Sequence, residues 1–292
     1  MTTAFMGHHA KLATSASGPV NQPFVFASEN IRKRGTIVAR QGIRGTRSQT
    51  ADDTRVGTYS VSGTLVLEPT PEDLAIWFPR ILGAAPSGTL YALAETLPEF
   101  VLAVDRGPKV FTYAGCKVSR ATLRGSEGSL LRLTLDVVGK TESVGAAGTF
   151  PALTLANTQP YIFSDLTLTL QAATREVKDF ELVIDNALVT DRFMNSVTLT
   201  DIPEGDRVIA LATTHAWATT NADLYDQALA GAAGTLLLTN GGYSTSFGFA
   251  TLQCPAESPT AAGRQEVPLV LAMTARKAGA TAELAVTHDS TP

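Results

Sequence analysis

The sequence predicts a mainly β fold made of two tandem copies of one domain, each a β-sandwich or partly closed β-barrel with one short helix. Three observations lead to this prediction. A motif of Phe, Cys and Gly recurs at one spacing, apolar residues alternate along most patterned segments, and each half of the chain has the same order of elements with a single helix.

The recurring motif, Phe-x4-Cys-x8-Gly, is the strongest indication of a duplication. Its repeat-marking residues are Phe111, Cys116 and Gly125 in the first half and Phe249, Cys254 and Gly263 in the second. The same shift lays the apolar residues of one following strand on those of the other. We therefore expect a core strand in each copy, and each cysteine is expected to be a small buried side chain, not half of a disulfide.

Further matches outside the motif divide the chain into three parts. Residues 22–24 match residues 159–161, so the repeat begins near residue 22. We place an N-terminal arm at residues 1–21, a first β domain at 22–145 and a second at 146–292. The arm is rich in small and polar residues without a period, and we expect it to be loose unless a neighbour orders it.

Each predicted domain has an alternating strand followed by a short helix. The strand spans residues 59–67 in the first copy and 208–217 in the second. In the first copy Thr70 caps a helix whose apolar residues recur at helical spacing. Pro79 is expected to kink this helix or end it early. The helix of the second copy, within residues 219–231, is weaker but keeps a capping residue and a terminating glycine.

The other patterned segments are predicted strands, because they alternate or are short and apolar. In the first copy they lie near residues 100–104, 110–113 and 130–138, and in the second near 166–170, 180–184, 236–238, 246–252 and 267–275.

Composition excludes several classes of protein. The net charge of −4 argues against a protein whose main task is to grip phosphate backbones, which needs a basic face. Two cysteines are too few for a disulfide framework, and no apolar run reaches membrane-spanning length, so we expect folding in a reducing cytoplasm. The charged fraction of 17% is low. Either partner subunits cover part of the surface, or Thr and Ser line the outer faces of the strands.

No motif in the chain predicts catalysis, a cofactor or a metal. Residues 139–141 resemble the end of a phosphate-binding loop but lack its first glycine and the helix that should follow. His288, Asp289 and Ser290 are adjacent, whereas a catalytic triad is assembled from separate parts of a fold, and we expect them to form a tail. The adjacent residues His8 and His9 are expected to be solvated. His215 is expected to be a packed or interfacial residue.

One basic run remains to be explained. Its residues are Arg32, Lys33, Arg34, Arg40, Arg44 and Arg47. A solvated loop is the simplest interpretation. A second is a long projecting hairpin that docks by ion pairs on an acidic surface of a neighbouring subunit. Nucleic-acid binding is disfavoured because aromatic residues do not alternate with the basic ones.

Two stretches, VFTYAGCKVSRATLRGSEGSLLRLTLDVVGKTE and FELVIDNALVTDRFMNSVTLTDIPEGDR, together with the duplicated β domain and the basic loop, resemble the tail tube proteins of long-tailed, siphophage-type bacteriophages. The resemblance covers most of the chain beyond the arm. It implies a structural protein of the virion tail, assembled in the host cytoplasm, whose rings stack into a hollow tube around a tape measure protein and later conduct DNA.

Members of this family with one domain form six-membered rings, so the resemblance implies homotrimeric rings for a two-domain chain. It also implies contacts with tail terminator and distal tail proteins, no cofactor, and a tube wall that is net negative or neutral toward the axis. Two alternatives remain open at this stage. One is an inner tube or baseplate protein of a contractile injection or secretion machine, and the other is a two-domain adhesin or carbohydrate-binding module.

Overall fold

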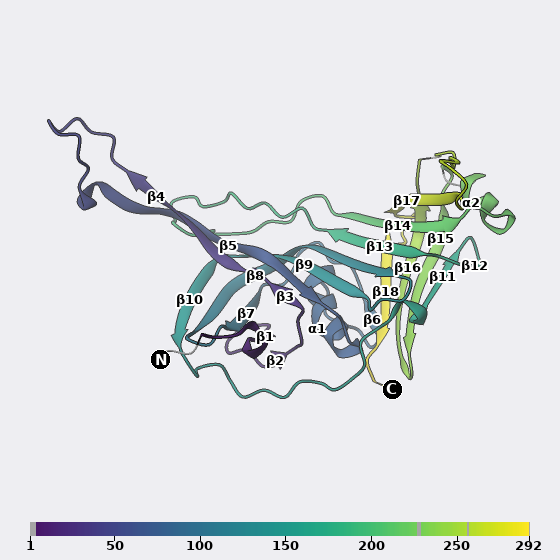
Figure 1. Cartoon of the computed structure of the whole chain (residues 1–292), viewed down its shortest axis with the longest axis horizontal. Helices are drawn as coiled ribbons and strands as arrows, with labels where there is room; N and C mark the ends of the chain where they lie inside the picture. Colours follow the sequence, from purple (N-terminus) through teal and green to yellow (C-terminus); the bar gives the residue numbers. More distant parts are fainter. Residues whose placement is uncertain (1–3, 227–228, 256, 292) are drawn as a thin grey trace.

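The computed structural model describes residues 4–226, 229–255 and 257–291 and confirms the mainly β prediction. Every pairing between named strands in the described part is antiparallel. Figure 1 shows an elongated molecule with a long hairpin projecting from one end and the C-terminal strands at the other.

The first half of the chain contains one helix, α1, surrounded by strands. The elements are β1 (Lys11–Ser15), β2 (Gln22–Pro23), β3 (Ser28–Glu29), β4 (Arg32–Ala39), β5 (Thr54–Leu67), α1 (Pro71–Leu82), β6 (Leu90–Tyr91), β7 (Phe100–Asp105), β8 (Lys109–Ser126), β9 (Arg132–Gly139) and β10 (Thr141–Ala146).

The second half repeats this arrangement with a shorter helix. Its elements are β11 (Leu166–Leu170), β12 (Ala173–Arg175), β13 (Asp179–Asp185), β14 (Val208–Ala216), α2 (Ala222–Asp226), β15 (Ala232–Asn240), β16 (Tyr243–Gln253), β17 (Pro268–Arg276) and β18 (Leu284–Asp289). Short 3-10 turns lie at Gly7–His9, Ala51–Asp53, Phe163–Asp165 and Thr219–Asn221.

The strands pair in the same order in both halves. In the first half the order is β4-β5-β9-β8-β7-β1, and in the second it is β13-β14-β17-β16-β15-β11. In addition, β10 pairs with β8 as β18 pairs with β16. This correspondence supports the two domains that we propose, divided after residue 145, but it includes β1 in the first of them and so does not support a separate arm over residues 1–21.

A matching irregularity fixes the register between the halves. The β7–β8 ladder shifts between Phe100 and Leu102, and the β15–β16 ladder shifts between Ala232 and Gly234. Both shifts skip the same number of residues on the partner strand, so a superposition of the two bulges lays Cys116 on Leu252.

Strand β8 joins the two halves. Its first part pairs with β7 and β10, and its last part pairs with β9 on one side and β13 on the other. The pairs run from Ser126 opposite Asp179 to Arg120 opposite Asp185. One sheet, β4-β5-β9-β8-β13-β14-β17, therefore passes from the first half into the second without a break.

Helix α1 covers the core side of this sheet. Thr70 caps it and receives a hydrogen bond from the Asp73 backbone N–H, as predicted. Trp77 lies in edge-to-face contact with Phe24 and Phe100, and its ring is fully buried. The expectation that Pro79 ends the helix early is wrong. The last turn continues to Leu82, because its apolar side chains are buried and offset the one backbone hydrogen bond that proline cannot donate.

The expectation of a loose arm over residues 1–21 is wrong for residues 11–15. These form β1, which pairs with β2 and, along its whole length, with residues 101–105 of β7. The strand lacks an apolar alternation because Thr14 is buried, and its hydroxyl donates a hydrogen bond to the Val101 carbonyl at 2.8 Å. His8 and His9 are exposed in the first 3-10 turn.

Candidate assembly surfaces

One side of the continuous sheet carries no covering layer within the described chain, and we call it the open face. Along β9, β13 and β14, buried residues alternate with partly exposed ones, so the buried set points to the core and the other set to the open face. Small side chains such as Ala210, Ala212 and Thr134 occupy much of it. The sheet is hollowed here, with depressions of about 920 Å³ across β3 to β13 and about 390 Å³ across β8 to β14.

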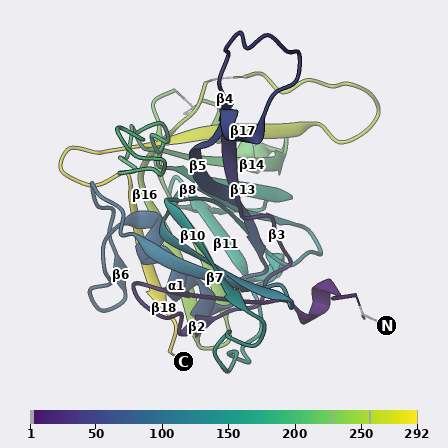
Figure 2. The same cartoon turned by 90° about the vertical axis from the view of Figure 1, so that its left-hand side faces the viewer.

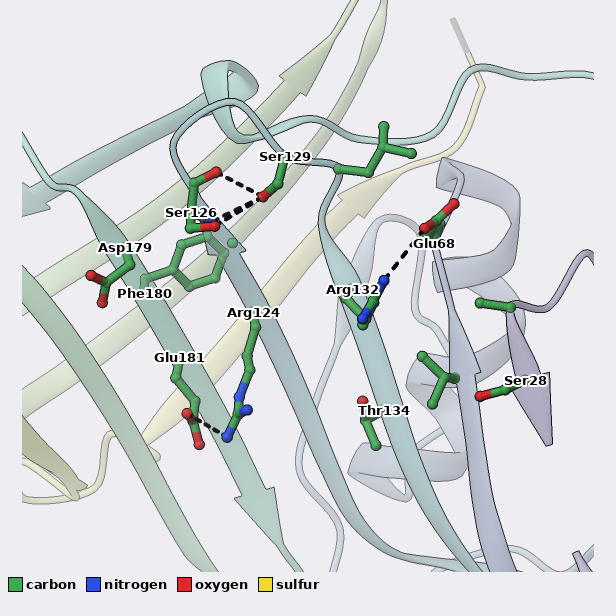
Figure 3. A pocket seen from close by; sticks show the side chains of 14 residues that line it. Ser28, Glu68, Arg124, Ser126, Ser129, Arg132, Thr134, Asp179, Phe180 and Glu181 are labelled. Carbon is green, nitrogen blue, oxygen red and sulfur yellow. Dashed lines mark hydrogen bonds and ion pairs between the residues drawn. The ribbon is translucent and has the colours of Figure 1, made fainter. Parts of the chain in front are cut away.

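Charged side chains on the open face occur in both signs. The basic ones are Arg32, Arg34, Arg120, Arg124, Arg132 and Arg276, and the acidic ones are Glu68, Asp136, Asp179, Glu181 and Asp185. Figure 3 shows Arg124 reaching Glu181 across the β8–β13 pair and Arg132 reaching Glu68. The corresponding N–O distances are 2.7 Å and 3.8 Å. The two signs nearly balance, so the face is close to neutral.

The basic run lies on a projecting hairpin formed by β4, the following loop and the start of β5. Figures 1 and 2 show this hairpin extending beyond the rest of the molecule. Arg32, Lys33 and Arg34 lie on β4, whereas Arg40, Arg44 and Arg47 lie in the loop; all but Arg44 are exposed, and Arg44 forms an ion pair with Asp53. The interpretation of these residues as an inter-ring contact stays a prediction.

The hairpin also carries apolar residues that the sequence interpretation missed. Ile37, Val38 and Val56 are largely exposed, and Ile43 at the tip is fully exposed. The sequence did contain a signal for these residues, namely an adjacent pair of β-branched residues and a lone isoleucine inside a basic run. Together with the arginines they make an amphipathic surface, a composition that favours the interpretation as a protein contact over a solvated loop.

The outer edge of β3 and β4 is capped near the root of the hairpin. The Ile31 N–H donates to the Glu29 carboxylate at 3.0 Å, and the Ile31 carbonyl accepts from Arg106 at 2.6 Å and from Tyr113 at 2.9 Å. Arg106 also holds Glu29 with two hydrogen bonds. Burial lowers the pKa of Arg106, but the hydrogen bonds and charge interactions with Glu29 and Tyr113 together outweigh it and raise the pKa above its ordinary value.

The repeat-marking residues do not all occupy equivalent places. Cys116 and Phe249 are buried, Phe111 is half-buried, and Gly125 lies in β8 at the junction with β13. Cys254 is buried just beyond β16, whereas Gly263 is exposed in a loop. Superposed bulges lay Tyr113, not Phe111, on Phe249. The gapless match was thus offset by two residues, an error that leaves every side chain on its proper face because strands repeat every two residues.

Both cysteines are buried, as is typical of cysteines that serve in packing. Both are free thiols, and burial raises the pKa of Cys116 to about 12. A thiol held in this way is protonated and unreactive at neutral pH.

The histidines away from the N-terminus are packed inside the protein. His215 is fully buried on β14, with Nδ1 2.8 Å from the Glu176 carbonyl and Nε2 2.9 Å from the Thr213 hydroxyl. This agrees with its interpretation as a packed residue. Of the expected tail at residues 288–290, His288 and Asp289 instead end β18, and His288 is buried against Phe78.

The described residues contain no cluster of three or more potential metal ligands. Among the helices of the same part of the chain, none is long and apolar enough to cross a membrane. No curated protein matches the chain. A family model described as phage tail tube protein matches residues 5–281, which is nearly the whole chain. The chain that forms these strands, the open face and the projecting hairpin therefore belongs to the phage tail tube protein family.

Proposed function

We propose that this protein is a non-catalytic structural protein of a siphophage-type tail tube, in which three copies form a ring and the rings stack into a hollow conduit. The observation that carries the proposal is the edge-to-edge junction of β8 and β13, which sets two similar strand arrangements side by side in one sheet. Three chains then supply six similar units, and heterologous contacts of one kind close the ring.

The open face lines the lumen in this proposal. Its near balance of arginines and acids suits a wall that DNA passes without being held, since retention on phosphates requires a net excess of basic side chains. The tape measure protein occupies the lumen during assembly, and tail terminator and distal tail proteins bind the two ends. The rings assemble in the host cytoplasm and remain in the virion tail.

The projecting hairpin joins one ring to the next. Its loop, which carries Arg40, Arg44, Arg47 and the exposed Ile43, follows β4 in a hairpin that extends beyond the rest of the molecule, where a neighbouring ring can receive it (Figure 1). Ion pairs would give this contact its orientation, and burial of the apolar side chains would give most of its free energy.

Electron microscopy of the purified chain tests the proposal. We expect rings with a threefold repeat at low concentration and stacked tubes at high concentration, together with detection of the chain in tails purified from the phage. Monodisperse monomers across concentration and salt conditions, and absence of the chain from phage tails, would overturn it. An adhesin would instead remain a small soluble oligomer.

A further inference from the structure

In the strand order that both halves share, the outermost strand of the second half, β13, has a further strand beside it, whereas its counterpart in the first half, β4, has none within the described residues. The outer edge of β13 is filled by the last part of β8. The counterpart of β13 is β4, which pairs with β5 as β13 pairs with β14. The opposite edge of β4 has no strand beside it within the described residues, and seven of its eight residues are exposed. The unpaired N–H and C=O groups of such an edge can pair with a strand of another chain.

The missing strand also has a counterpart at the other end of the chain. With the two bulges superposed, the last part of β8, Arg120–Ser126, corresponds to residues 256–262. Strand β16 ends at Gln253, so it stops where β8 continues. Residues 255 and 257–267 form no strand, and most of them are exposed. Both members of a junction are therefore present in one chain, at opposite ends of its sheet.

The register of the existing junction predicts which residues meet. With the bulges superposed, Val137 on β9 corresponds to Met273 on β17, and both are buried. Following the strand pairings outward from these two residues, through β5 and β14, Lys33 on β4 corresponds to Ile184 on β13. Ile184 lies opposite Ala121, which corresponds to Glu257. Lys33 and Glu257 are both exposed and carry opposite charges. The predicted junction thus brings together a complementary pair.

The next position along the junction is also matched. Ile31 corresponds to Leu182, which lies opposite Leu123, and Leu123 corresponds to Pro259. Residues of odd number on β8 direct their backbone groups toward β13, since the carbonyl of Ser119 on β8 accepts from the N–H of Asn186, which follows β13, and the Glu127 N–H just beyond β8 donates to the Lys178 carbonyl. Pro259 has no N–H to donate, and the Ile31 carbonyl facing it already accepts from Arg106 and Tyr113. The proline therefore leaves no acceptor unsatisfied.

We propose that the segment after β16 of one copy docks along the free edge of β4 of a second copy, with Glu257 opposite Lys33, in the register of the β8–β13 junction. The inference rests on the proposed ring and names its interface. Three such contacts alternate with three internal junctions, so that a single sheet closes around the ring and no exposed edge remains.

Cysteine cross-linking tests the register. The variant combines Arg32→Cys and Ser258→Cys in a Cys254→Ala background. These positions form a non-hydrogen-bonded pair in the proposed register, where Cα atoms lie about 4.5 Å apart, within the range of a disulfide. We expect oxidised rings to give covalent dimers and trimers on non-reducing gels, with the trimer as the largest product. The matched control, Arg32→Cys with Thr260→Cys, is shifted by two residues and should cross-link at least about tenfold less.

The outcomes separate the interface from the tube itself. Tubes of normal yield that give no disulfide, or as much disulfide in the shifted control, would overturn the docking register while the tube function stands. Covalent products larger than the trimer would overturn the closure by three copies. Failure of the wild-type chain to form rings or tubes would instead overturn the proposed function.

A charge exchange gives a second test that does not need oxidation. Lys33→Glu and Glu257→Lys should each raise the protein concentration required for ring formation by about threefold or more, and the double variant should restore it. Circular dichroism of the unassembled chain should stay unchanged and its melting temperature should change little, because both side chains are exposed and the one contact that Lys33→Glu removes, between the Lys33 ammonium and the Tyr59 ring, lies on the surface. Equal losses in the single and double variants would contradict the pairing.

Discussion

Arg124 on β8 and Glu181 on β13 lie directly opposite each other, with Nη2 and Oε2 2.7 Å apart, at the seam between the two halves of the chain. The ion pair stands on the open face, where 62% of the Arg124 side chain is exposed. On the core side of the same two strands, Leu123 lies opposite Leu182, and both are buried. The seam therefore has an exposed side with an ion pair and a buried side with apolar packing, and the two sides contribute differently to the free energy of unfolding.

We expect the apolar side to hold the seam together. Leu182→Ala should lower the free energy of unfolding by about 2–5 kcal/mol, because it removes buried methyl groups and leaves a cavity. Arg124→Ala should cost less than about 1 kcal/mol, because a solvent-exposed ion pair gains little. Denaturant titration of the unassembled chain measures both. A larger loss for the arginine variant would reverse this assignment.

Gly125 is predicted to be irreplaceable at the seam, unlike its sequence match Gly263. A Cβ at position 125 would lie 2.4 Å from Leu131 Cδ2 and 2.7 Å from Phe180 Cε1, whereas one at position 263 would meet nothing within 4 Å. Gly125→Ala should therefore destabilise the chain by about 1–3 kcal/mol through overpacking. Gly263→Ala, the matched control, should change stability by less than about 0.5 kcal/mol. Similar effects of both substitutions would show that the two sites are equivalent after all.

The sequence sufficed for features encoded in local patterns. The Thr70 cap and the alternation along β5, β9 and β14 were predictable, because a capping box and a period of two need no tertiary information. The mainly β class followed from these segments together.

Features that depend on tertiary contacts were not predictable in the same way. Strand β1 was missed because its buried Thr14 is satisfied by a carbonyl of β7, which no local pattern reveals. The register of the repeat was missed by two residues because both alignments keep the same faces buried. The β8–β13 seam had no sequence signal that we identified, although the acidic residues of β13 and the arginines of β8 lie opposite each other in the structure.

Acidification should destabilise the fold through His215. Burial lowers the pKa of this histidine below its ordinary value, so at acidic pH the unfolded chain binds a proton that the folded chain does not. Stability should thus be highest above the unfolded pKa of about 6.5 and fall as the pH drops below it. Melting curves between pH 7.5 and 5.5, in steps of about half a unit, give the slope.

The controls for this pH dependence compare the slope of stability against pH and not the absolute stability, because His215→Gln also disturbs packing. That variant should make the decline between neutral and acidic pH shallower, and the remaining decline should come from His288, whose pKa burial also lowers, whereas His8→Gln, in an exposed turn, should leave the slope unchanged. A wild-type slope that survives in the His215 variant would assign the effect to other groups.

Charge reversal in the hairpin should impair stacking of rings more than folding. Arg40, Arg44 and Arg47 lie in the hairpin loop, outside the buried core, so replacing all three with Glu should shorten tubes or abolish them while the melting temperature changes little. Loss of the Arg44–Asp53 ion pair should cost less than about 1 kcal/mol. Tube length by electron microscopy is the measurement.

The matched control reverses three exposed lysines elsewhere, Lys11, Lys109 and Lys277. It changes the net charge by the same amount but leaves the hairpin intact, so tubes should form as in the wild type. Unchanged tube length and yield in the hairpin variant would defeat the docking interpretation. Equal impairment of tube formation in both variants would show that net charge, and not docking of the hairpin, causes the loss.

The near neutrality of the open face leads to a prediction about DNA passage. Asp179→Asn, Glu181→Gln and Asp185→Asn together leave the arginines of this face in clear excess. Tubes should still assemble, because these side chains are at least partly exposed and their amides keep the oxygens that accept from Thr214 and Ala187. DNA ejection from reconstituted phage should slow, and the delay should shrink as salt rises, since phosphate contacts weaken as counterions compete.

The control for ejection neutralises the same number of acids away from the open face, with Glu95→Gln, Glu127→Gln and Asp226→Asn. These exposed residues do not belong to the set that we place on the lumen wall, so ejection should proceed at the wild-type rate. A delay of equal size in both variants would trace the effect to net charge. Ejection that is normal in the open-face variant, with tubes intact, would mean that another surface faces the DNA, because an uncompensated row of arginines along the path of the phosphates must slow it.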